Sequence, residues 1–464
     1  MPGAEPFHAD GGPIGVVLSH GLSGSPASMR PWGEYLAERG YTVDVPRLPG
    51  HGTTVAECNR TRWDDWYATV ERSYLQMRER CEIVFVGGLS MGGALAVMLY
   101  RWVALKEKPA ATGLEKPAAL LAAWALVMIP FSTDASQSLV YYRRFFLFAA
   151  IWVCAGCATD QRRRLLMLGF LLGGAMAISV YGQIHHAQLA GGFMSRRMDV
   201  LFNAMTSGAL LMMASMVAAG FLIAPGLDRR LKIVVGVAVL PVLLGLVMTM
   251  TRSAQLGLLV GLGAMLLLVR PKLFGVFLGL LLIATVVLAL FGEHLMSPRM
   301  WGRLNPQYLV AGENTQSRLE MWRGGLEMVK AHPITGVGDR NLEEIGPDYY
   351  TSEIGVYHGH LHNNLIQMAV IWGVPGLILG QAFLFAGLWH LGKSWWDLRR
   401  RSDGVKRAPA RAGWVLGAIG AWISFYIAGF TEWYFGDAES MLIFLAILGC
   451  ALGPRAATSS KEAD

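Results

Sequence analysis

The chain has 464 residues, of which 53% are hydrophobic and only 16% are charged, and its mean hydropathy is +0.40. Soluble domains average about 25% charged residues, so this composition excludes an ordinary soluble enzyme and indicates a membrane protein. The net charge of +7 matters less than its placement along the chain, and the five cysteines follow no disulfide-framework pattern.

The first hundred residues differ from the rest because they mix apolar and charged positions. Strands are expected over 14–19, 41–45 and 83–87, and helices over 31–39 and about 63–80. Residues 88–92 then read Gly-Leu-Ser-Met-Gly, a G-x-S-x-G motif. This motif marks a sharp turn between a strand and a helix that exposes a nucleophilic serine.

Three motifs, SHGLSGSP, RLPGHG and GLSMGGALA, together resemble bacterial carboxylesterases and monoacylglycerol lipases of the α/β-hydrolase superfamily. By this resemblance Ser90 would be the nucleophile, and the peptide N–H groups of Leu22 and Met91 would form the oxyanion hole. The resemblance covers about residues 10–100, the first half of such an enzyme. The triad acid and histidine follow the serine in this superfamily, but no further strand–helix alternation follows here. We therefore predict an inactive, truncated hydrolase-like segment over residues 1–100.

From about residue 118 onward, apolar runs of membrane-spanning length follow one another almost without pause. A polytopic bundle of about ten transmembrane helices is expected, at 118–131, 145–158, 165–184, 203–224, 231–250, 254–269, 273–291, 363–391, 412–431 and 438–453. A basic linker, 101–117, precedes this membrane domain, 118–453. A long loop, 292–361, separates its seventh and eighth helices, and a tail, 454–464, follows it.

The placement of lysine and arginine predicts the orientation of these helices. Residues 393–411 carry seven basic residues and are expected to face the cytoplasm. If the ten helices alternate in direction, the loops on the cytoplasmic side are consistently richer in lysine and arginine than those on the outer side. The loop 292–361 is therefore expected outside, and the hydrolase-like segment and the C-terminus are expected in the cytoplasm.

Arginines mark two of the outward-facing motifs. Arg252 stands in MTMTRSAQLG at the boundary of two apolar runs, where an arginine commonly does no more than reach the headgroups. Arg318 and Arg323 flank the apolar stripe of an amphipathic helix in the long loop, and solvated arginines on an interfacial helix are the alternative interpretation. The turn GVGDRN, which contains Arg340, follows that helix and suits close backbone approach.

Histidines mark the third outward-facing motif. His358, His360 and His362 precede a long apolar helix, and His362 and Asn363 are expected at its outer N-terminus. Zinc is conceivable here, but no nearby cysteine or carboxylate is expected to complete a persuasive ligand set. A general base is the preferred interpretation.

Taken in order, TRSA, SRLEMW, HPITGVG and HNNLIQ resemble the O-antigen ligase family of membrane glycosyltransferases, which is related to O-antigen polymerases and protein O-oligosaccharyltransferases. The resemblance covers about residues 105–453. That family typically has about twelve helices, and the hydrolase-like segment stands where the first two or so would be. The resemblance implies transfer of a glycan from undecaprenyl diphosphate to a lipid A–core sugar hydroxyl, at the periplasmic face of the bacterial inner membrane, in lipopolysaccharide biosynthesis.

The same resemblance assigns Arg252 and Arg318 to the departing diphosphate and His362 to deprotonation of the attacking hydroxyl. Arginine presents a planar fork of donors to phosphate and keeps its charge, and imidazole titrates near neutrality. Candidate substrate-binding residues are Arg323, Arg340, Asn363 and His360. No metal or cofactor is expected because the leaving group is already activated, and direct displacement would invert the anomeric centre.

Several alternatives stay open. A polymerase or protein O-oligosaccharyltransferase of the same superfamily would differ only in its acceptor. A membrane-anchored serine esterase using Ser90 is disfavoured by its missing acid and histidine. A channel would not explain the outer arginines and histidines, and an artificial fusion, or chimera, would explain the abrupt join near residues 99–105. The expected partners are the lipid-linked glycan donor, the lipid A–core acceptor and membrane lipids, with no nucleic acid.

Overall fold

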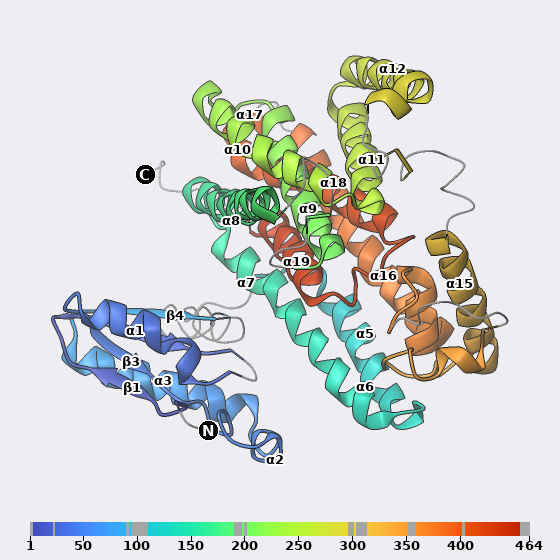
Figure 1. Cartoon of the computed structure of the whole chain (residues 1–464). Helices are drawn as coiled ribbons and strands as arrows, with labels where there is room; N and C mark the ends of the chain where they lie inside the picture. Colours follow the sequence, from blue (N-terminus) through green and yellow to red (C-terminus); the bar gives the residue numbers. More distant parts are fainter. Residues whose placement is uncertain are drawn as a thin grey trace. The chain divides into compact units, whose positions relative to one another are not determined.

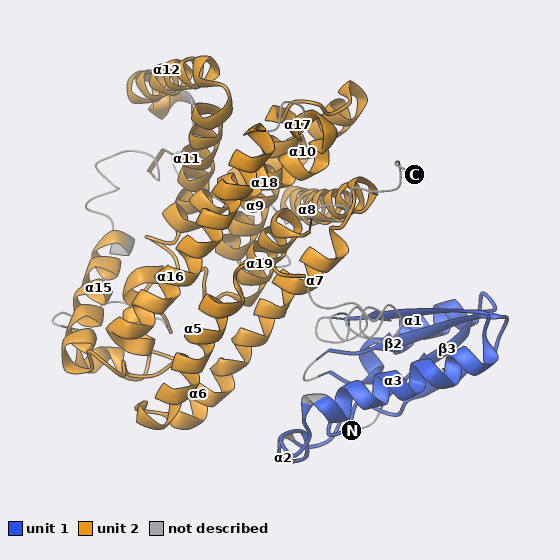
Figure 2. Cartoon of the chain, turned by 180° about the vertical axis from the view of Figure 1, so that it is seen from behind, with its two compact units in different colours: residues 1–109 blue, residues 110–464 orange. Residues whose placement is uncertain are grey.

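In the computed structural model the chain divides into two compact units, residues 1–109 and 110–464, which Figure 2 shows in different colours. The residues described are 3–21, 24–89, 93, 110–189, 197–198, 202–295, 301–302, 313–350, 359–400 and 404–454. Each unit has buried apolar residues of its own.

Unit 1 contains a four-stranded sheet in the order β1-β3-β2-β4. The strands are β1 (Phe7–Ala9), β2 (Ile14–Ser19), β3 (Thr42–Val45) and β4 (Ile83–Gly88). The helices are α1 (Arg30–Ala37), α2 (Val55–Cys58) and α3 (Trp63–Arg80). Strand β2 pairs in parallel with β3 and β4, and β1 pairs antiparallel with β3. The predicted strands and both predicted helices are confirmed, whereas the short edge strand β1 was not predicted.

Strand β2 shows why its sequence is a continuous apolar run. It is buried from Gly15 to Ser19 because helices cover both of its faces. Met77 of α3 and Val17 belong to one small core, and Met29 and Val16 belong to another. A Cβ on Gly15 would lie 2.5 Å from Cγ of Met77, so glycine is what lets α3 approach the sheet closely.

Unit 2 is a bundle of helices (Figure 1). Its main helices are α5 (Glu115–Met128), α6 (Ala135–Tyr142), α7 (Ala149–Cys157), α8 (Gln161–Leu189), α9 (Ala204–Ile223), α10 (Arg229–Met248), α11 (Arg252–Val269), α12 (Pro271–Leu295), α15 (Glu313–Ala331), α16 (Asn364–Arg400), α17 (Gly404–Arg407), α18 (Pro409–Ala428) and α19 (Ala438–Leu452). All ten predicted membrane segments coincide with helices. One of them, predicted over 145–158, belongs to a longer helical stretch, Ala135–Cys157.

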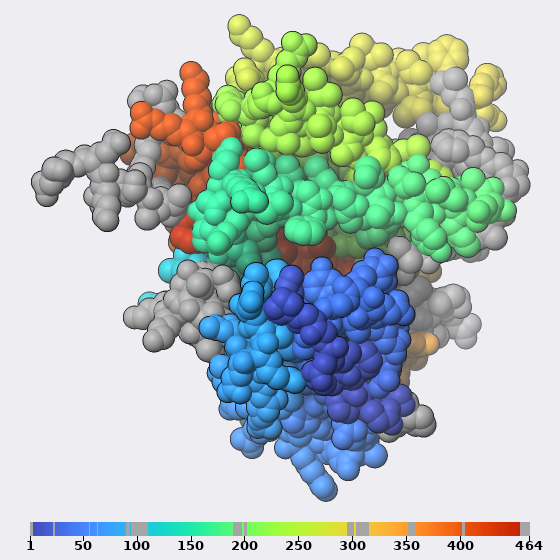
Figure 3. Space-filling model, turned by 90° about the vertical axis from the view of Figure 1, so that its left-hand side faces the viewer, coloured from blue at the N-terminus to red at the C-terminus, as the bar shows by residue number. Residues whose placement is uncertain are grey.

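Eight helical stretches within the described ranges are long and apolar enough to cross a membrane, and the chain is a multi-pass membrane protein. Helices α5 and α19, with 14 and 15 residues, are shorter. Helix α8 forms a long exposed ridge in Figure 3, and its exposed residues Leu166, Phe170 and Ile184 are apolar. Helix α12 likewise exposes apolar side chains all around, which contact with lipid allows.

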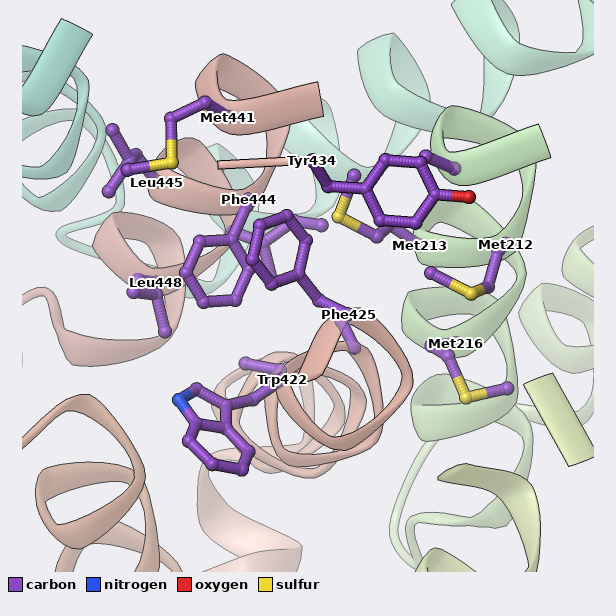
Figure 4. Packing of buried hydrophobic residues seen from close by; sticks show 14 of the residues in the cluster. Met212, Met213, Met216, Trp422, Phe425, Tyr434, Met441, Phe444, Leu445 and Leu448 are labelled. Atoms are coloured by element: carbon purple, nitrogen blue, oxygen red, sulfur yellow. The ribbon is translucent and has the colours of Figure 1, made fainter. Parts of the chain in front are cut away.

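Helices α9 and α18 lie at the centre of the bundle, and nearly all their residues are buried. Glycines let their backbones approach, because a Cβ on Gly220 would lie 2.4 Å from the backbone nitrogen of Gly417. Helix α18 also packs against α19, where the rings of Phe425 and Phe444 stack with their centroids 4.2 Å apart (Figure 4).

A kink in α16 fixes the turn that follows α15. Gly373 has φ 70 inside α16, two residues before Pro375, and the helix bends there. The backbone N–H of Val374 donates to the carbonyl of Pro333 at 2.8 Å, and the backbone N–H of Val337 donates to the carbonyl of Val370 at 2.8 Å. The turn therefore docks into the kink, which holds α15 beside α16 (Figure 1).

Candidate active site

A cavity of about 330 Å³ lies in unit 2 and is lined by α11, α15 and nearby loops. Its charged lining residues are Arg197, Arg252, Arg318 and Glu432. Its apolar lining residues are Met205, Met250, Leu256, Leu319 and Trp322. The structure thus brings Arg252 and Arg318, two arginines singled out in the sequence, into one cavity.

Arg252 is the first residue of α11, where the backbone N–H groups of the helix end add to its positive charge. The preceding turn is tightly held, because Thr251 Oγ1 donates to the carbonyl of Ala204 at 2.8 Å. Met250 in this turn has φ 49, a left-handed conformation that is uncommon for any residue other than glycine. Within the described ranges His362, with φ 50, is the one other such residue. Both flank the same site, and strained backbone of this kind clusters at functional sites.

Arg318 reaches the cavity from α15 and is fixed by the loop between α18 and α19. Its NH1 donates to the carbonyl of Thr431 at 2.8 Å, and its NH2 lies 3.5 Å from Oε2 of Glu432. The charges of Arg252 and Arg318 also act on each other across the cavity. The two guanidinium groups therefore form one cationic surface rather than two separate contacts.

His362 is paired with a carboxylate. Its Nδ1 lies 2.6 Å from Oε1 of Glu432, and both side chains are less than a tenth exposed. Burial acts to raise the pKa of Glu432, but the hydrogen bond from His362 and the charge of Arg318 hold it below its usual value. Because an ionised carboxylate only accepts hydrogen bonds, Nδ1 carries a proton, and in the neutral ring the lone pair lies on Nε2. This is the tautomer that a general base needs.

Two asparagines fasten the loop that carries Glu432. Asn363 caps the first turn of α16 through its Oδ1, while its Nδ2 donates to the carbonyl of Phe430 at 2.9 Å. The backbone N–H of Asn364 donates to the carbonyl of Gly429 at 2.7 Å. A Cβ on Gly429 would lie 2.2 Å from Nδ2 of Asn364, so glycine is needed at this crossing. The structure therefore gives Asn363, which the sequence made a candidate substrate-binding residue, a role in holding the loop.

His362 and the four predicted substrate-binding residues, Arg323, Arg340, Asn363 and His360, are not among the lining residues of the cavity. Arg323 is 71% exposed and lies near Glu320 on its own helix. Arg340 pairs with Glu344 and donates to Oγ1 of Thr133 at 3.1 Å. Arg340 therefore ties the turn after α15 to the segment that follows α5.

His360 lies against His362, with ring centroids 4.3 Å apart. One ligand atom from each of His360, His362 and Glu432 lies within 4.8 Å of the others, close enough to hold a metal ion. The expectation that no carboxylate completes a ligand set here is therefore wrong, because folding supplies Glu432. Its two oxygens are already engaged by His362 and Arg318, so a metal ion would have to compete with both contacts.

Sequence reasoning missed Glu432 and Arg197. The signal for Glu432 was a single carboxylate in GFTEWYFG, directly after an apolar run that was expected to end outside. The signal for Arg197 was the basic pair in SRRMD, on a loop with the same predicted location. Neither motif reveals that its residue reaches the cavity of Arg252.

Most of the hydrolase-like candidate residues lie outside the part of the chain that the structure describes. Ser90, Leu22 and Met91 all lie outside the described residues. His20 is described, and both of its ring nitrogens are engaged by backbone groups: Nε2 accepts from the N–H of Leu48 at 3.2 Å, and Nδ1 lies 3.0 Å from a carbonyl. Burial lowers the pKa of His20 to about 4. These contacts give His20 a structural role.

Comparison with known proteins finds two families in this chain. Residues 237–380 match the family model described as O-Antigen ligase, and residues 16–171 match the one described as Alpha/beta hydrolase family. Both resemblances seen in the sequence are confirmed. Arg252, Arg318 and His362 lie inside the first match, whereas Arg197 and Glu432 lie outside it. The second match runs beyond residue 100 into helices of unit 2, although the four strands all end by Gly88.

Similar proteins include a lipase, a carboxylesterase and a solved structure from work on lipolytic enzymes. The chain is 52% identical over 99 residues to a thermostable monoacylglycerol lipase of Bacillus sp. (strain H-257), which covers 21% of this chain and 40% of the lipase. It is 38% identical over 103 residues to a carboxylesterase of Bacillus subtilis (strain 168), and this match covers 22% of this chain and 42% of the carboxylesterase. A solved structure from work on the metagenome-derived lipolytic enzymes LipS and LipT is 50% identical, covers 22% of this chain and 41% of that chain, and has a TM-score of 0.21. The chain thus spans about two fifths of these relatives.

Proposed function

We propose that this chain, which carries an O-antigen ligase domain, is a metal-independent, inverting glycosyltransferase. It transfers a glycan from undecaprenyl diphosphate to a sugar hydroxyl of lipid A–core, at the periplasmic face of the bacterial inner membrane. The observation that supports this most is that Arg252 and Arg318 share a cavity with Glu432, which in turn orients His362. The domain match supports a ligase-type glycosyltransferase, and we propose the donor and the acceptor.

Each part of the site suits one part of the reaction. Nε2 of His362 takes the proton from the acceptor hydroxyl as its oxygen attacks the anomeric carbon of the donor sugar. The bond from that carbon to the phosphate oxygen breaks, and its electron pair leaves with undecaprenyl diphosphate. Arg252 and Arg318 neutralise the charge that develops on the leaving group. Glu432 stabilises the imidazolium that forms, as the carboxylate of a serine-protease triad does.

The cavity also suits the physical character of the donor. Its arginines favour a diphosphate, while methionine, leucine and tryptophan side chains line the rest of it. The lysine and arginine distribution supports a periplasmic location, because the loops on the other side of the bundle are the more basic ones. The helices make direct access from the bilayer possible for a lipid-linked substrate.

The N-terminal segment, residues 1–100, is proposed to be catalytically inactive, and the linker 101–117 joins it to the membrane domain. The acid and histidine of the triad follow the serine in that superfamily. The chain spans only about two fifths of its lipolytic relatives. Activity is therefore assigned to the membrane domain, 118–453.

Complementation of a ligase-deficient bacterial strain tests the proposal. The full chain and a chain lacking residues 1–104 should both restore O-antigen-capped lipopolysaccharide, whereas His362→Ala should leave the core uncapped at equal protein abundance. Capping by His362→Ala at wild-type levels would contradict the assignment. If longer polymer or glycosylated protein accumulates without capping, the proposed acceptor is wrong and the proposed donor is retained.

A further inference from the structure

We propose that Arg197 completes a three-arginine site with Arg252 and Arg318 and binds the second phosphate group of a prenyl diphosphate. The inference rests on the proposed function, since it takes a lipid diphosphate as the ligand. Arg197 lies outside the residues that match the O-antigen ligase model, so the family match assigns it no role.

The first support is the way in which Arg197 is held. Its Nε donates to the carbonyl of Thr249 at 2.9 Å, and its NH2 donates to Oγ1 of Thr251 at 3.0 Å. The next residue is also fastened, because the backbone N–H of Met198 donates to the carbonyl of Met248 at 3.0 Å. The guanidinium group is therefore fixed on the turn directly before Arg252. An arginine held in this way is preorganised to bind a ligand, because its guanidinium group does not move freely in solvent.

The second support is the charge of the cavity. Three arginines line it together with one carboxylate, which gives the lining a formal charge of +2 from three positive groups and one negative group. The carboxylate, Glu432, is already engaged by Arg318 and His362. Bringing guanidinium groups together costs energy, and an anion with more than one charge relieves that cost. A diphosphate has two phosphate groups and can meet more than one arginine fork.

The third support is the apolar lining beside these charges. Met205, Met250, Leu256, Leu319 and Trp322 line the same cavity. A soluble nucleotide or inorganic phosphate would leave this surface without an apolar partner, whereas a prenyl chain covers it. The ligand that fits both parts is an amphiphile with a diphosphate head.

Arg197 differs from Arg318 in its surroundings. Arg318 contacts Glu432, so its loss disturbs the orientation of His362 as well as the leaving group. The side chain of Arg197 is instead held by hydrogen bonds to Thr249 and Thr251, in the turn before α11. Loss of Arg197 should therefore weaken binding of the donor more than turnover.

Binding of farnesyl diphosphate and farnesyl monophosphate to the full-length protein in nanodiscs, measured by titration calorimetry, tests this proposal. Arg197→Gln should weaken the diphosphate about tenfold and leave the monophosphate within about twofold, because one charge-assisted contact to the second phosphate is lost. Arg197→Lys should give an intermediate loss, since it keeps the charge but not the fork. Lys330→Gln, which removes an exposed charge paired with Glu327, is the matched control and should change neither affinity.

The outcomes separate this inference from the proposed function. Equal weakening of both ligands, or no weakening, would overturn the role of Arg197. If Arg252→Gln still abolishes diphosphate binding in that case, the proposed function stands. If the wild-type protein binds neither ligand, both proposals fail. If Arg197→Gln lowers the melting temperature of the protein, Arg197→Lys is the variant that tests the inference. An unchanged preference for diphosphate over monophosphate in Arg197→Lys would then refute it.

Discussion

Oε1 of Glu432 lies 2.6 Å from Nδ1 of His362, although 70 residues separate the two in the chain. The pair is buried, and Asn363 and Asn364 fasten the loop of Glu432 to the start of α16. This contact orients the imidazole ring of His362, because the carboxylate determines which ring nitrogen carries the proton. It also links the histidine to the cavity, since Glu432 contacts Arg318.

Glu432→Gln should reduce turnover by about 100-fold, because the amide can still accept from Nδ1 but cannot stabilise the imidazolium by charge. Glu432 acts through His362, so the informative measurement is the pH–rate profile of glycan transfer. Its acidic limb should move to lower pH in Glu432→Gln, since a neutral partner disfavours protonation of the ring. A purely structural role for Glu432 would lower activity at every pH without moving that limb.

Arg318→Lys should reduce transfer more than Arg252→Lys. Both changes keep the charge and lose the planar fork, which we expect to cost about 10- to 100-fold in turnover. Arg318 additionally donates to the carbonyl of Thr431, so the lysine variant also loosens the loop of Glu432. Arg163→Lys, at an exposed arginine paired with Asp160, is the matched control and should retain full transfer. Equal effects of the two cavity substitutions would contradict the distinct role of Arg318.

Most of the fold could be predicted from the sequence because it depends on runs of neighbouring residues. Membrane helices need a sufficient length of apolar residues, and strand β2 is apolar because both faces are buried. The stretch 135–157 was underestimated because it starts with polar residues, which are helical as well. Strand β1 was missed because its three residues form a strand only through pairing with β3.

The candidate site could be predicted only in part. Arg252, Arg318 and His362 stand in motifs whose residues are close in sequence, so a resemblance identifies them one by one. Glu432 and Arg197 reach the site through long-range contacts, made by Asn363 in one case and by Thr249 in the other. No local pattern encodes such contacts. The structure was therefore needed to find the partner of the base and the third arginine.

Zinc should inhibit transfer, whereas a chelator should leave the activity of the wild-type protein unchanged. A zinc ion can displace the proton that His362 shares with Glu432 and take His360 as a further ligand. His360→Ala should raise the zinc concentration needed for half inhibition by at least about tenfold. Loss of activity in the chelator, restored by a divalent cation, would show instead that a metal takes part in the reaction.

Asp437 should make the stability of the membrane domain depend on pH. It precedes α19, and burial, together with the nearby Glu439, raises its pKa from 3.8 to about 6. Since the folded state holds the proton of Asp437 more tightly than the unfolded state does, the contribution of this group to stability is greatest below pH 4. It falls as the pH rises to about 6 and stays lower above that pH. A shift of this size corresponds to at most about 3 kcal/mol. Asp437→Asn should therefore raise the melting temperature at pH 8 and leave it nearly unchanged at pH 4. An equal change at both pH values would contradict this sign.

A fluorophosphonate probe should leave Ser90 unlabelled in the full-length protein. A serine hydroxyl is a weak nucleophile until a histidine, oriented by a carboxylate, accepts its proton. The histidine described in the loop after β2, His20, uses both ring nitrogens on backbone groups, and burial lowers its pKa to about 4. The similar lipase and carboxylesterase extend well beyond the part that this chain shares with them. A bacterial monoacylglycerol lipase labelled in parallel gives the positive control, and mass spectrometry of the peptide containing Ser90 gives the readout. Stoichiometric labelling that disappears in Ser90→Ala would mean that the N-terminal segment has retained a working nucleophile, and the esterase alternative would then replace the inactive fragment.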